Sequence, residues 1–441
     1  MTNNKENIAW FRASTRYINA HRNKIFVVLL SGEALADKNL PNIVYDLNLL
    51  HSLGVKLVLV HGARPQITTA LDQQGRQSNY YKNLRITEAG YIETIKQTVG
   101  SLSLTLESLF SLGISNSPMH GADIRLCRGN FVTAKPVGIH DGIDFQYTGQ
   151  VRKIQSAAIE QQLNNNNIVM LSNLGYSLTG EVFNLSAEEI ATKTAIALKA
   201  DKLILLIPSD GVIDDSGKLV ASLTEEDARC YANKLANRDD VESVCIRQAL
   251  LASLRAYAHN VHRSHLISYK SDGALLQELF SREGNGSLLS GDNFDRLRDA
   301  DINDVAGILT LIKPLEENGT LVKRSRELLE TEIDNFKLIE LEGATIACAA
   351  IYPISEDSGE VACIAIDPRY YNKGYGDQLL SSLETTAREK NLNKLFVLTT
   401  VAAHWFLERG FVETDVSELP EGRKQLYNYQ RKSKVLQKIL D

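Results

Sequence analysis

The chain has 441 residues, of which 44% are apolar and 23% charged, a composition typical of folded globular domains that excludes a mostly disordered or fibrous chain. Its 48 basic and 54 acidic residues give a net charge of −6, which does not favour nucleic acid as the main partner. The longest apolar runs have about the length of a strand, whereas a membrane span needs roughly 20 such residues. We therefore expect no membrane segment. Because the N-terminus resembles neither a secretory signal nor a transit peptide, we expect a cytoplasmic protein.

The cysteines give no sign of a metal site or a disulfide framework. No two of them stand in a CxxC spacing, so we expect free thiols in a reducing compartment and no metal. The cysteines are Cys127, Cys230, Cys245, Cys348 and Cys363.

The first two-thirds of the chain repeats one pattern, in which an apolar run ends in a Gly-containing turn and a helical segment follows. The runs are Ile25–Leu30, Lys56–Val60, Ile168–Leu171 and Leu203–Ile207, and one of the helical segments is Ser186–Ala200. Continuous Val, Ile and Leu runs favour parallel strands that are buried on both faces. The pattern predicts an open α/β sheet whose ligands bind at the carboxyl ends of the strands.

Turn-forming residues then mark a boundary. Residues 284–293 are rich in Gly, Ser and Asn, which predicts a linker between a first domain over 1–283 and a second over 294–441. Within the second domain the pattern predicts helices over 301–313 and 321–336, strands over 337–341, 344–352 and 360–366, a helix over 376–390, a strand over 394–400, a short helix over 402–409 and a strand over 411–416.

The most specific local signal in the second domain is a strand, a glycine-containing loop and a helix over 364–380. Gly374 and Gly376 would let an anion approach the free N–H groups of the helix start, and Lys373 adds a positive charge. Taken alone, this arrangement is more often a turn that caps a helix. The surrounding residues, however, resemble the acetyl-CoA loop of the Gcn5-related N-acetyltransferases, although Tyr371 stands where that family has Gln or Arg.

Longer stretches extend the resemblance over nearly the whole chain. Residues 319–330, 394–400, 404–411 and 425–434 resemble the bacterial N-acetylglutamate synthases, and the first two-thirds resembles their amino-acid-kinase domain. The implied fold class is α/β, with an N-terminal amino-acid-kinase-like open sheet and a C-terminal mixed α/β acetyltransferase domain. The implied reaction transfers acetyl from acetyl-CoA to the α-amine of L-glutamate, the first step of arginine synthesis.

The resemblance also assigns roles in catalysis. Glu360 matches the general base and Thr399 a hydroxyl near the leaving sulfur, although a solvated strand-edge carboxylate and a plain β-former remain alternatives. Cys363 would line the site, and direct attack by the amine is favoured over an acetyl-cysteine because a strand Cys is usually a small apolar residue. The residues implied to bind acetyl-CoA are Cys363, Ile364, Ala365, Ile366, Tyr371, Asn372, Lys373, Gly374, Tyr375 and Gly376.

The glutamate site implied by the resemblance contains basic side chains. Arg324 and Arg431 match carboxylate-binding positions, and Ser433 adds a hydroxyl beside the lining residue Cys363. A guanidinium can hold a carboxylate through two parallel hydrogen bonds. The alternative for residues 431–434 is a solvated basic face.

The first domain departs from the amino-acid kinases at the phosphate site. Leu30 stands where those enzymes place a Lys, and Ala63 and Arg64 replace glycines of a phosphate-binding turn. Residues 186–189 replace a segment that carries an Asp. We therefore expect no phosphoryl transfer.

In the resembling family this domain binds L-arginine, which inhibits the enzyme. The residues implied to bind L-arginine here are Tyr17, Lys199, Gly273, Ala274, Glu278 and Gly284. Family members are hexamers, and the helix expected over 8–21 could form such a contact or simply pack onto its own domain. The alternatives for the whole chain are an acetylglutamate kinase with an accessory transferase domain, a non-catalytic sensor of arginine and CoA, and an acetyltransferase for proteins or antibiotics, which the paired arginines disfavour.

Overall fold

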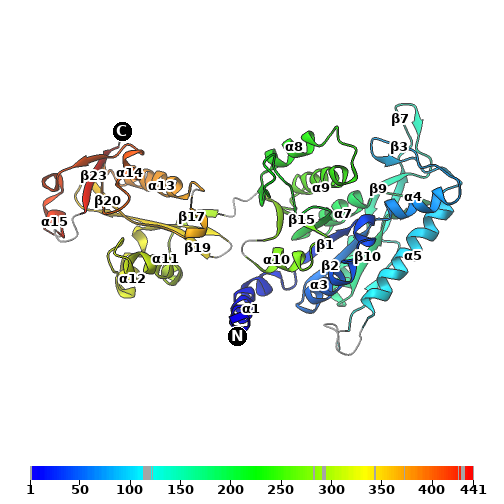
Figure 1. The fold of residues 1–441 in the computed structure, drawn as a ribbon, viewed down its shortest axis with the longest axis horizontal. Helices are drawn as coiled ribbons and strands as arrows, with labels where there is room; N and C mark the ends of the chain where they lie inside the picture. The colour runs from blue at the N-terminus through cyan, green and yellow to red at the C-terminus, as the bar shows by residue number, and fades with distance from the viewer. Residues whose placement is uncertain are drawn as a thin grey trace. The chain divides into compact units, whose positions relative to one another are not determined.

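The computed structural model of the protein describes residues 2–112, 121, 123–281, 284–290, 295–341, 344–371, 373–425, 427–428 and 433–440. The chain divides into two compact units, Met1–Gly291 and Asp292–Asp441 (Figure 1). Within the described residues, no helix has both the length and the apolar character that crossing a membrane requires.

The first unit is built on a mixed sheet with the strand order β14-β16-β15-β13-β1-β2-β10-β5. β1 (Ile25–Leu30) pairs in parallel with both β2 (Lys56–His61) and β13 (Lys202–Ile207), and β10 (Ile168–Ser172) pairs in parallel with β2. The parallel arrangement predicted from these four runs is confirmed. The sheet also contains β5 (Leu126–Cys127), β14 (Ser222–Leu223), β15 (Arg263–Ser268) and β16 (Gly286–Ser290).

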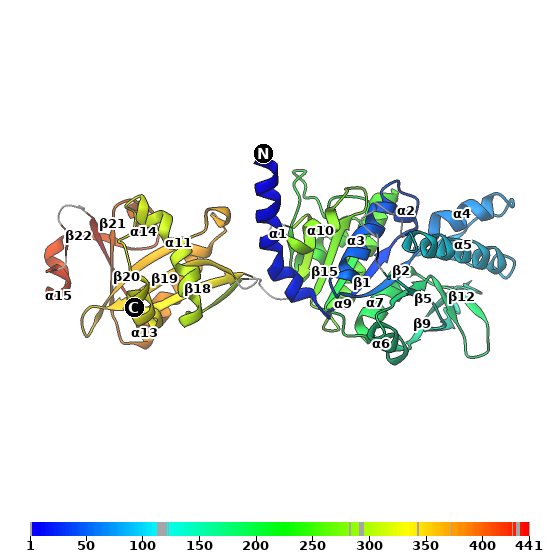
Figure 2. The same cartoon turned by 90° about the horizontal axis from the view of Figure 1, so that it is seen from below.

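Helices cover both faces of this sheet (Figure 2). Alternate residues of β1 enter opposite cores: Phe26 and Val28 pack in one, and Val27 and Leu29 pack in the other. Both cores exclude water, which explains why the central strands are apolar along their whole length. On one face lie α1 (Thr2–His21), α3 (Leu40–Ser52), α5 (Ile92–Phe110) and α10 (Ala274–Phe280), and on the other lie α6 (Ser156–Asn164), α7 (Ala187–Ala197), α8 (Glu225–Lys234) and α9 (Val241–Tyr257). The short α2 (Gly32–Leu35) and α4 (Arg64–Asp72) follow β1 and β2.

A smaller sheet with the order β12-β11-β6-β9, and two short hairpins, are absent from the elements expected from the sequence. Their strands are short and carry polar residues, so they have no continuous apolar run. They are β3 (Tyr80–Tyr81), β4 (Leu84–Arg85), β6 (Val132–Pro136), β7 (Ile139–His140), β8 (Ile143–Asp144), β9 (Gly149–Ile154), β11 (Leu174–Tyr176) and β12 (Val182–Asn184).

The stretch predicted as a linker over 284–293 contains a strand of the large sheet. β16 pairs antiparallel with β15 and parallel with β14. A side chain at Gly286 would meet the carbonyl oxygen of Leu266 at 2.6 Å. The small residues that suggested a linker thus permit close packing against β15, and only residues 291–293 at the end of that stretch lie outside the described part.

The second unit is built on a sheet with the order β17-β18-β19-β20-β21-β23-β22, antiparallel except between β20 and β21. Its strands are β17 (Asp295–Asp299), β18 (Phe336–Leu341), β19 (Ala344–Pro353), β20 (Ser358–Ile366), β21 (Lys394–Thr399), β22 (Val412–Thr414) and β23 (Lys434–Ile439). Its α-helices are α11 (Val305–Glu317), α12 (Arg326–Glu332), α13 (Tyr375–Glu389), α14 (Ala403–Leu407) and α15 (Glu421–Lys424).

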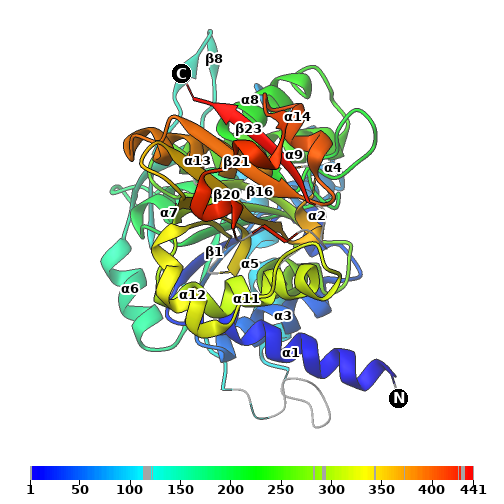
Figure 3. The same ribbon diagram turned by 90° about the vertical axis from the view of Figure 1, so that its left-hand side faces the viewer.

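α11 and α12 pack on one face of this sheet and α13 on the other (Figure 3). The helix predicted over 321–336 is shorter than expected. α12 begins only after Ser325, whose hydroxyl accepts the Leu328 N–H and caps the helix, and residues 321–325 before it are irregular. The irregular segment places Arg324 beside the sheet.

Candidate active site

The sheet of the second unit opens between its two parallel strands. β20 and β21 pair from Ser358–Lys394 to Val361–Val397, and this pairing then ends. On its other side β20 stays paired with β19 as far as Ile366. Residues 362–366 therefore present backbone N–H and C=O groups along an open edge, which an extended ligand can use as a strand would.

A bulge lies at the start of this edge. The register between β19 and β20 shifts between the pairs Ala350–Ala362 and Cys348–Ala365, and Cys363 has a φ of 53°. The Cys348 thiol donates to the Cys363 carbonyl oxygen at 3.7 Å. The bulge turns the strand at the point where β21 separates, as bulges commonly do beside active sites.

The open edge leads directly into the start of α13. Gly374 precedes that helix with a φ of 79°, and the first intrahelical hydrogen bond runs from Gln378 N to Gly374 O. The N–H groups of Gly376 and Asp377 thus have no acceptor within the helix and can bind an anion. Lys373 lies 5.1 Å from the centroid of the Tyr370 ring. The edge and the helix start together suit a long ligand with a phosphate end.

Glu360, the predicted base, is held by an arginine that the sequence did not single out. Arg423 of α15 donates from Nε to one oxygen of Glu360 and from Nη2 to the other, the latter at 2.9 Å. The Arg423 side chain is 21% exposed and that of Glu360 13%. The hydrogen bond with Glu360 raises the pKa of Arg423 above its ordinary value despite desolvation. This is a two-pronged, largely desolvated ion pair.

Arg324 lies on the same face of the sheet, close to Cys363. Its N–H donates to Glu316 at 2.9 Å, and its guanidinium donates to the carbonyl oxygen of Val322 at 3.2 Å. Burial raises the pKa of the Cys363 thiol to about 11. The positive charge of Arg324 acts to lower this pKa, and the negative charge of Glu360 acts to raise it. The structure therefore brings Glu360, Cys363 and Arg324 together, as predicted.

Tyr352 completes this neighbourhood and was not expected from the sequence. It pairs with Glu360 across β19 and β20, so both side chains point to the same face. Burial raises the pKa of the Tyr352 phenol, and Arg324 and Glu332 lie close enough to act on it. No sequence signal marks Tyr352, because it occupies an apolar strand like any aromatic residue.

Thr399 and Ser433 lie at the other side of the opening. The Thr399 hydroxyl oxygen accepts the N–H groups of Val401 at 3.3 Å and Ala402 at 2.9 Å, and so keeps its own hydrogen to donate. Thr399 pairs with Lys434, the residue after Ser433, and the Ser433 carbonyl accepts from the Tyr427 hydroxyl at 2.6 Å. The predicted residues Asn372 and Arg431 lie outside the described part of the chain.

In the first unit, the turns where a kinase would hold phosphate pack against each other. A Cβ on Gly32 would meet Pro65 Cδ at 2.5 Å and Arg64 N at 2.9 Å, and a Cβ on Gly62 would meet Gly32 N at 3.2 Å. Leu30 is fully buried and offers no charge. Backbone and the Pro65 ring thus fill the space at this edge.

The predicted arginine-binding Glu278 belongs to a buried triad. Lys202 Nζ lies 2.9 Å from His265 Nε2, and His265 Nδ1 lies 2.6 Å from Glu278. Burial, followed by the charge of Lys202, lowers the pKa of His265 to about 4, so the ring is neutral, accepts from Lys202 and donates to Glu278. Burial alone would raise the pKa of Glu278, but its hydrogen bonds outweigh this and lower it.

The other predicted arginine-site residues surround α10 or lie elsewhere on the unit. Gly273 precedes α10 with a φ of 72°, Ala274 begins it, and a Cβ on Gly284 would meet Glu278 Oε2 at 2.6 Å. Tyr17 is buried on α1, where its hydroxyl accepts from Arg16 at 2.7 Å. Lys199 is exposed after α7 with a φ of 48°.

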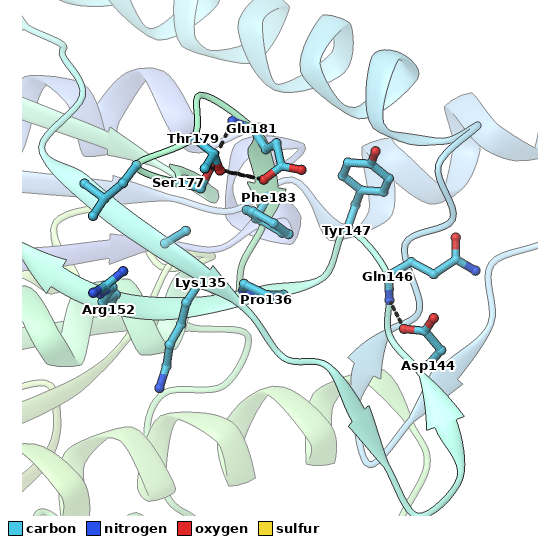
Figure 4. A pocket seen from close by; sticks show the side chains of 12 residues that line it. Lys135, Pro136, Asp144, Gln146, Tyr147, Arg152, Ser177, Thr179, Glu181 and Phe183 are labelled. Carbon is cyan, nitrogen blue, oxygen red and sulfur yellow. Dashed lines mark hydrogen bonds between the residues drawn. The ribbon is translucent and has the colours of Figure 1, made fainter.

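A cavity of ≈ 580 Å³ lies along the smaller sheet of the first unit (Figure 4). The Glu181 carboxylate accepts from Thr179 at 2.8 Å, while Lys135 and Arg152 extend away from it. The residues that line it include none of those predicted from the sequence. Across the described part of the chain, no three His, Cys, Asp or Glu side chains are grouped so that they could hold a metal ion.

Comparison with known proteins matches both units. A model of the amino acid kinase family matches residues 24–265, and one of the acetyltransferase (GNAT) family matches residues 306–411. These matches confirm the predicted fold class. The amino-acid acetyltransferase of Ectopseudomonas mendocina is 49% identical over 98% of this chain and 99% of its own, and that of Azotobacter vinelandii is 49% identical over 99% and 100%.

Two solved structures of N-acetylglutamate synthase from Neisseria gonorrhoeae are also similar to the chain. One is a complex with coenzyme A and L-arginine, at 34% identity, with 98% of this chain and 99% of that chain covered and a TM-score of 0.86. The other is a complex with coenzyme A and N-acetyl-glutamate, at 35% identity, with the same coverage and a TM-score of 0.61.

Proposed function

The chain belongs to the amino-acid acetyltransferases, the N-acetylglutamate synthases, and from this premise we propose how its residues carry out the reaction. Acetyl-CoA lies along the open edge of β20, with its diphosphate at the start of α13 and its thioester near the bulge at Cys363. L-Glutamate binds on the face that carries Glu360 and Arg324. The observation that carries this proposal is the open β20 edge at residues 362–366, which begins just after Glu360 and leads to the start of α13.

The reaction needs a free amine, a polarised thioester and a leaving thiolate. Glu360 accepts a proton from the substrate ammonium, directly or through a water, and the amine nitrogen attacks the thioester carbonyl carbon. Backbone N–H groups of the open edge donate to the oxyanion that forms. The C–S bond then breaks, the CoA sulfur leaves as thiolate, and it takes up the second proton, which the attacking nitrogen loses as the amide forms, while the proton held by Glu360 passes to water. The Thr399 hydroxyl, which retains its hydrogen, donates toward that sulfur.

Cys363 lines the site and does not carry the acetyl group. Only a thiolate attacks efficiently, and burial raises the pKa of the Cys363 thiol to about 11. At neutral pH the side chain is therefore a neutral, apolar wall beside the thioester. This favours direct transfer over an acetyl-cysteine intermediate.

The first unit acts in this proposal as the regulatory site. L-Arginine binds around α10, where its guanidinium meets Glu278 and where Tyr17, Lys199, Gly273, Ala274 and Gly284 contribute. The packed turns at Gly32 and Gly62 support a regulatory role over phosphoryl transfer. Inhibition requires that L-arginine bind two states of the protein with different affinity.

Two further proposals concern the setting. The exposed side chains of Ile8, Trp10 and Phe11 on α1 support contacts between copies of the chain, as in a hexamer. The cysteines are all free thiols, which supports action in the cytoplasm.

The test follows thiol release from acetyl-CoA with L-glutamate, with and without L-arginine, in the wild type and in Cys363→Ala. We expect turnover that needs L-glutamate, that falls with L-arginine and that persists in Cys363→Ala. An inactive Cys363→Ala protein that still binds CoA would refute direct transfer. Turnover indifferent to L-arginine would refute the regulatory site.

A further inference from the structure

The pairing of Glu360 with Arg423 leaves the proposed base poorly placed to accept a proton. Both carboxylate oxygens receive hydrogen bonds from one guanidinium. A carboxylate that accepts two hydrogen bonds from a guanidinium in a mostly buried pair loses part of that charge-assisted interaction when it is protonated. Because the guanidinium stays charged at neutral pH, the pair opens by an exchange of partners and not by proton transfer.

The substrate itself carries the group that can make this exchange. We infer that Arg423 leaves Glu360 when L-glutamate binds and takes the α-carboxylate of the substrate, so that the base becomes free only in the substrate complex. This inference rests on the proposed function. It adds Arg423 as a substrate-binding residue beside Arg324 and Arg431.

Geometry selects the α-carboxylate over the side-chain carboxylate. The amine must approach Glu360 to give up its proton, and Arg423 touches Glu360. In L-glutamate the amine and the α-carboxylate share one carbon, whereas the side-chain carboxylate is two methylene groups further away. A guanidinium that adjoins the base therefore meets the α-carboxylate, and Arg324 beside Cys363 is left for the other one.

The placement of Arg423 suits a side chain that changes partners. It stands on α15, a helix of four residues that begins after Pro420. Its side chain remains 21% exposed, so water can reach the pair while it opens. The device also has a protective consequence, because a base that is occupied without substrate does not activate water against the thioester.

The test compares Arg423→Gln and Arg423→Lys with the wild type, using thiol release with L-glutamate, with its α-amide and with L-glutamine. Arg298→Gln is the matched control, since Arg298 forms a similar, mostly buried ion pair with Asp304 at 2.7 Å, on the edge strand β17, three strands away from β20. Stabilisation of each variant by CoA against heat shows that its acetyl-CoA site is intact.

We expect Arg423→Gln to raise the KM for L-glutamate by about 30-fold or more and to leave that for acetyl-CoA within about twofold. The wild type should prefer L-glutamate to its α-amide by about 100-fold, because a site built for a charge rejects the neutral analogue. Arg423→Gln should lose most of that preference and keep the preference over L-glutamine. In Arg423→Gln, the rate of thiol release from acetyl-CoA without any amine should rise relative to the rate of acetyl transfer to L-glutamate.

Two changes in the behaviour of the variants would overturn the inference, as would the absence of any change. One is a fall in kcat at an unchanged KM for L-glutamate, which would mean that Arg423 only orients Glu360. The other is an Arg423→Gln variant that loses its preference for L-glutamate over L-glutamine and keeps its preference over the α-amide. A wild type that shows no turnover with L-glutamate would refute the proposed function as well, whereas an active wild type with unaffected variants would refute only the role of Arg423.

Discussion

Replacing Glu278 by Gln tests whether the buried triad is an ionic unit. The substitution keeps the size of the side chain. It also keeps an oxygen that can accept the Asn285 N–H, which donates to Glu278 Oε2 at 2.7 Å in the wild type. It removes the negative charge that balances the charge of Lys202 through His265. The site is buried, because the His265 and Glu278 side chains are only 3% and 5% exposed. Removing one partner of a buried ion pair typically costs about 3–5 kcal/mol.

The size of the effect is large enough for thermal unfolding to detect. At about 2–4 °C per kcal/mol for a unit of this size, the first transition should fall by about 6–20 °C. The double variant Glu278→Gln/Lys202→Met removes both charges and should regain part of that loss. Inhibition by L-arginine, measured well below the new midpoint, should weaken in Glu278→Gln while uninhibited activity stays the same.

Two outcomes would refute this reasoning. A single variant whose stability stays within about 0.5 kcal/mol of the wild type would mean that the triad is not an ionic unit. A double variant less stable than Glu278→Gln would show that the two charges do not compensate each other.

Further predictions concern titration and close packing. Because the pKa of His265 falls from 6.5 to about 4 on folding, unfolded chains bind a proton there before folded ones do. The contribution of His265 alone to the stability of the first unit should therefore fall by up to about 1.4 kcal/mol per pH unit as pH drops from 6.5 to 4, measured by scanning calorimetry as the difference in pH dependence between the wild type and His265→Gln. Burial, and then Asp272, raises the pKa of Asp46 to about 7, so the contribution of Asp46 has the opposite sign and falls as pH rises from 4 to 7. Asp46→Asn should gain about 1–2 kcal/mol at pH 8 in urea titrations, unlike the exposed control Asp239→Asn. A Cβ at Gly376 would meet Trp405 at 2.8 Å, so Gly376→Val should raise the KM for acetyl-CoA about tenfold without changing that for L-glutamate.

The sequence predicts the large elements because they carry strong patterns. β1, β2, β10 and β13 are continuous apolar runs, and α13 shows an apolar stripe at helical spacing. The small strands β3 to β9 have neither pattern, and their pairing depends on contacts distant in the sequence. Residues 286–290 were predicted to be part of a linker but form β16, because the small residues of a tightly packed strand look like those of a linker.

The candidate site divides in the same way. Glu360, Cys363 and Arg324 could be assigned from motifs near each of them, and the structure brings them together. Arg423 could not be assigned, because it stands 63 residues from its partner Glu360 in a basic stretch without a distinctive spacing. Composition does not mark the end of the β20–β21 pairing, since neither strand changes where they separate, and only the family resemblance implied an acetyl-CoA edge near residues 363–366.

The role of Glu360 beside the open edge of β20 is tested most directly by one comparison. Wild type and Glu360→Gln would be given L-glutamate and acetyl-CoA, and both the released CoA and the acetylated product would be measured by mass spectrometry. We expect the wild type to form N-acetyl-L-glutamate and one CoA per product, and the variant to bind CoA normally with a kcat about 10²–10⁴-fold lower. Product formation at an undiminished rate by Glu360→Gln, or none by the wild type, would contradict the proposed site.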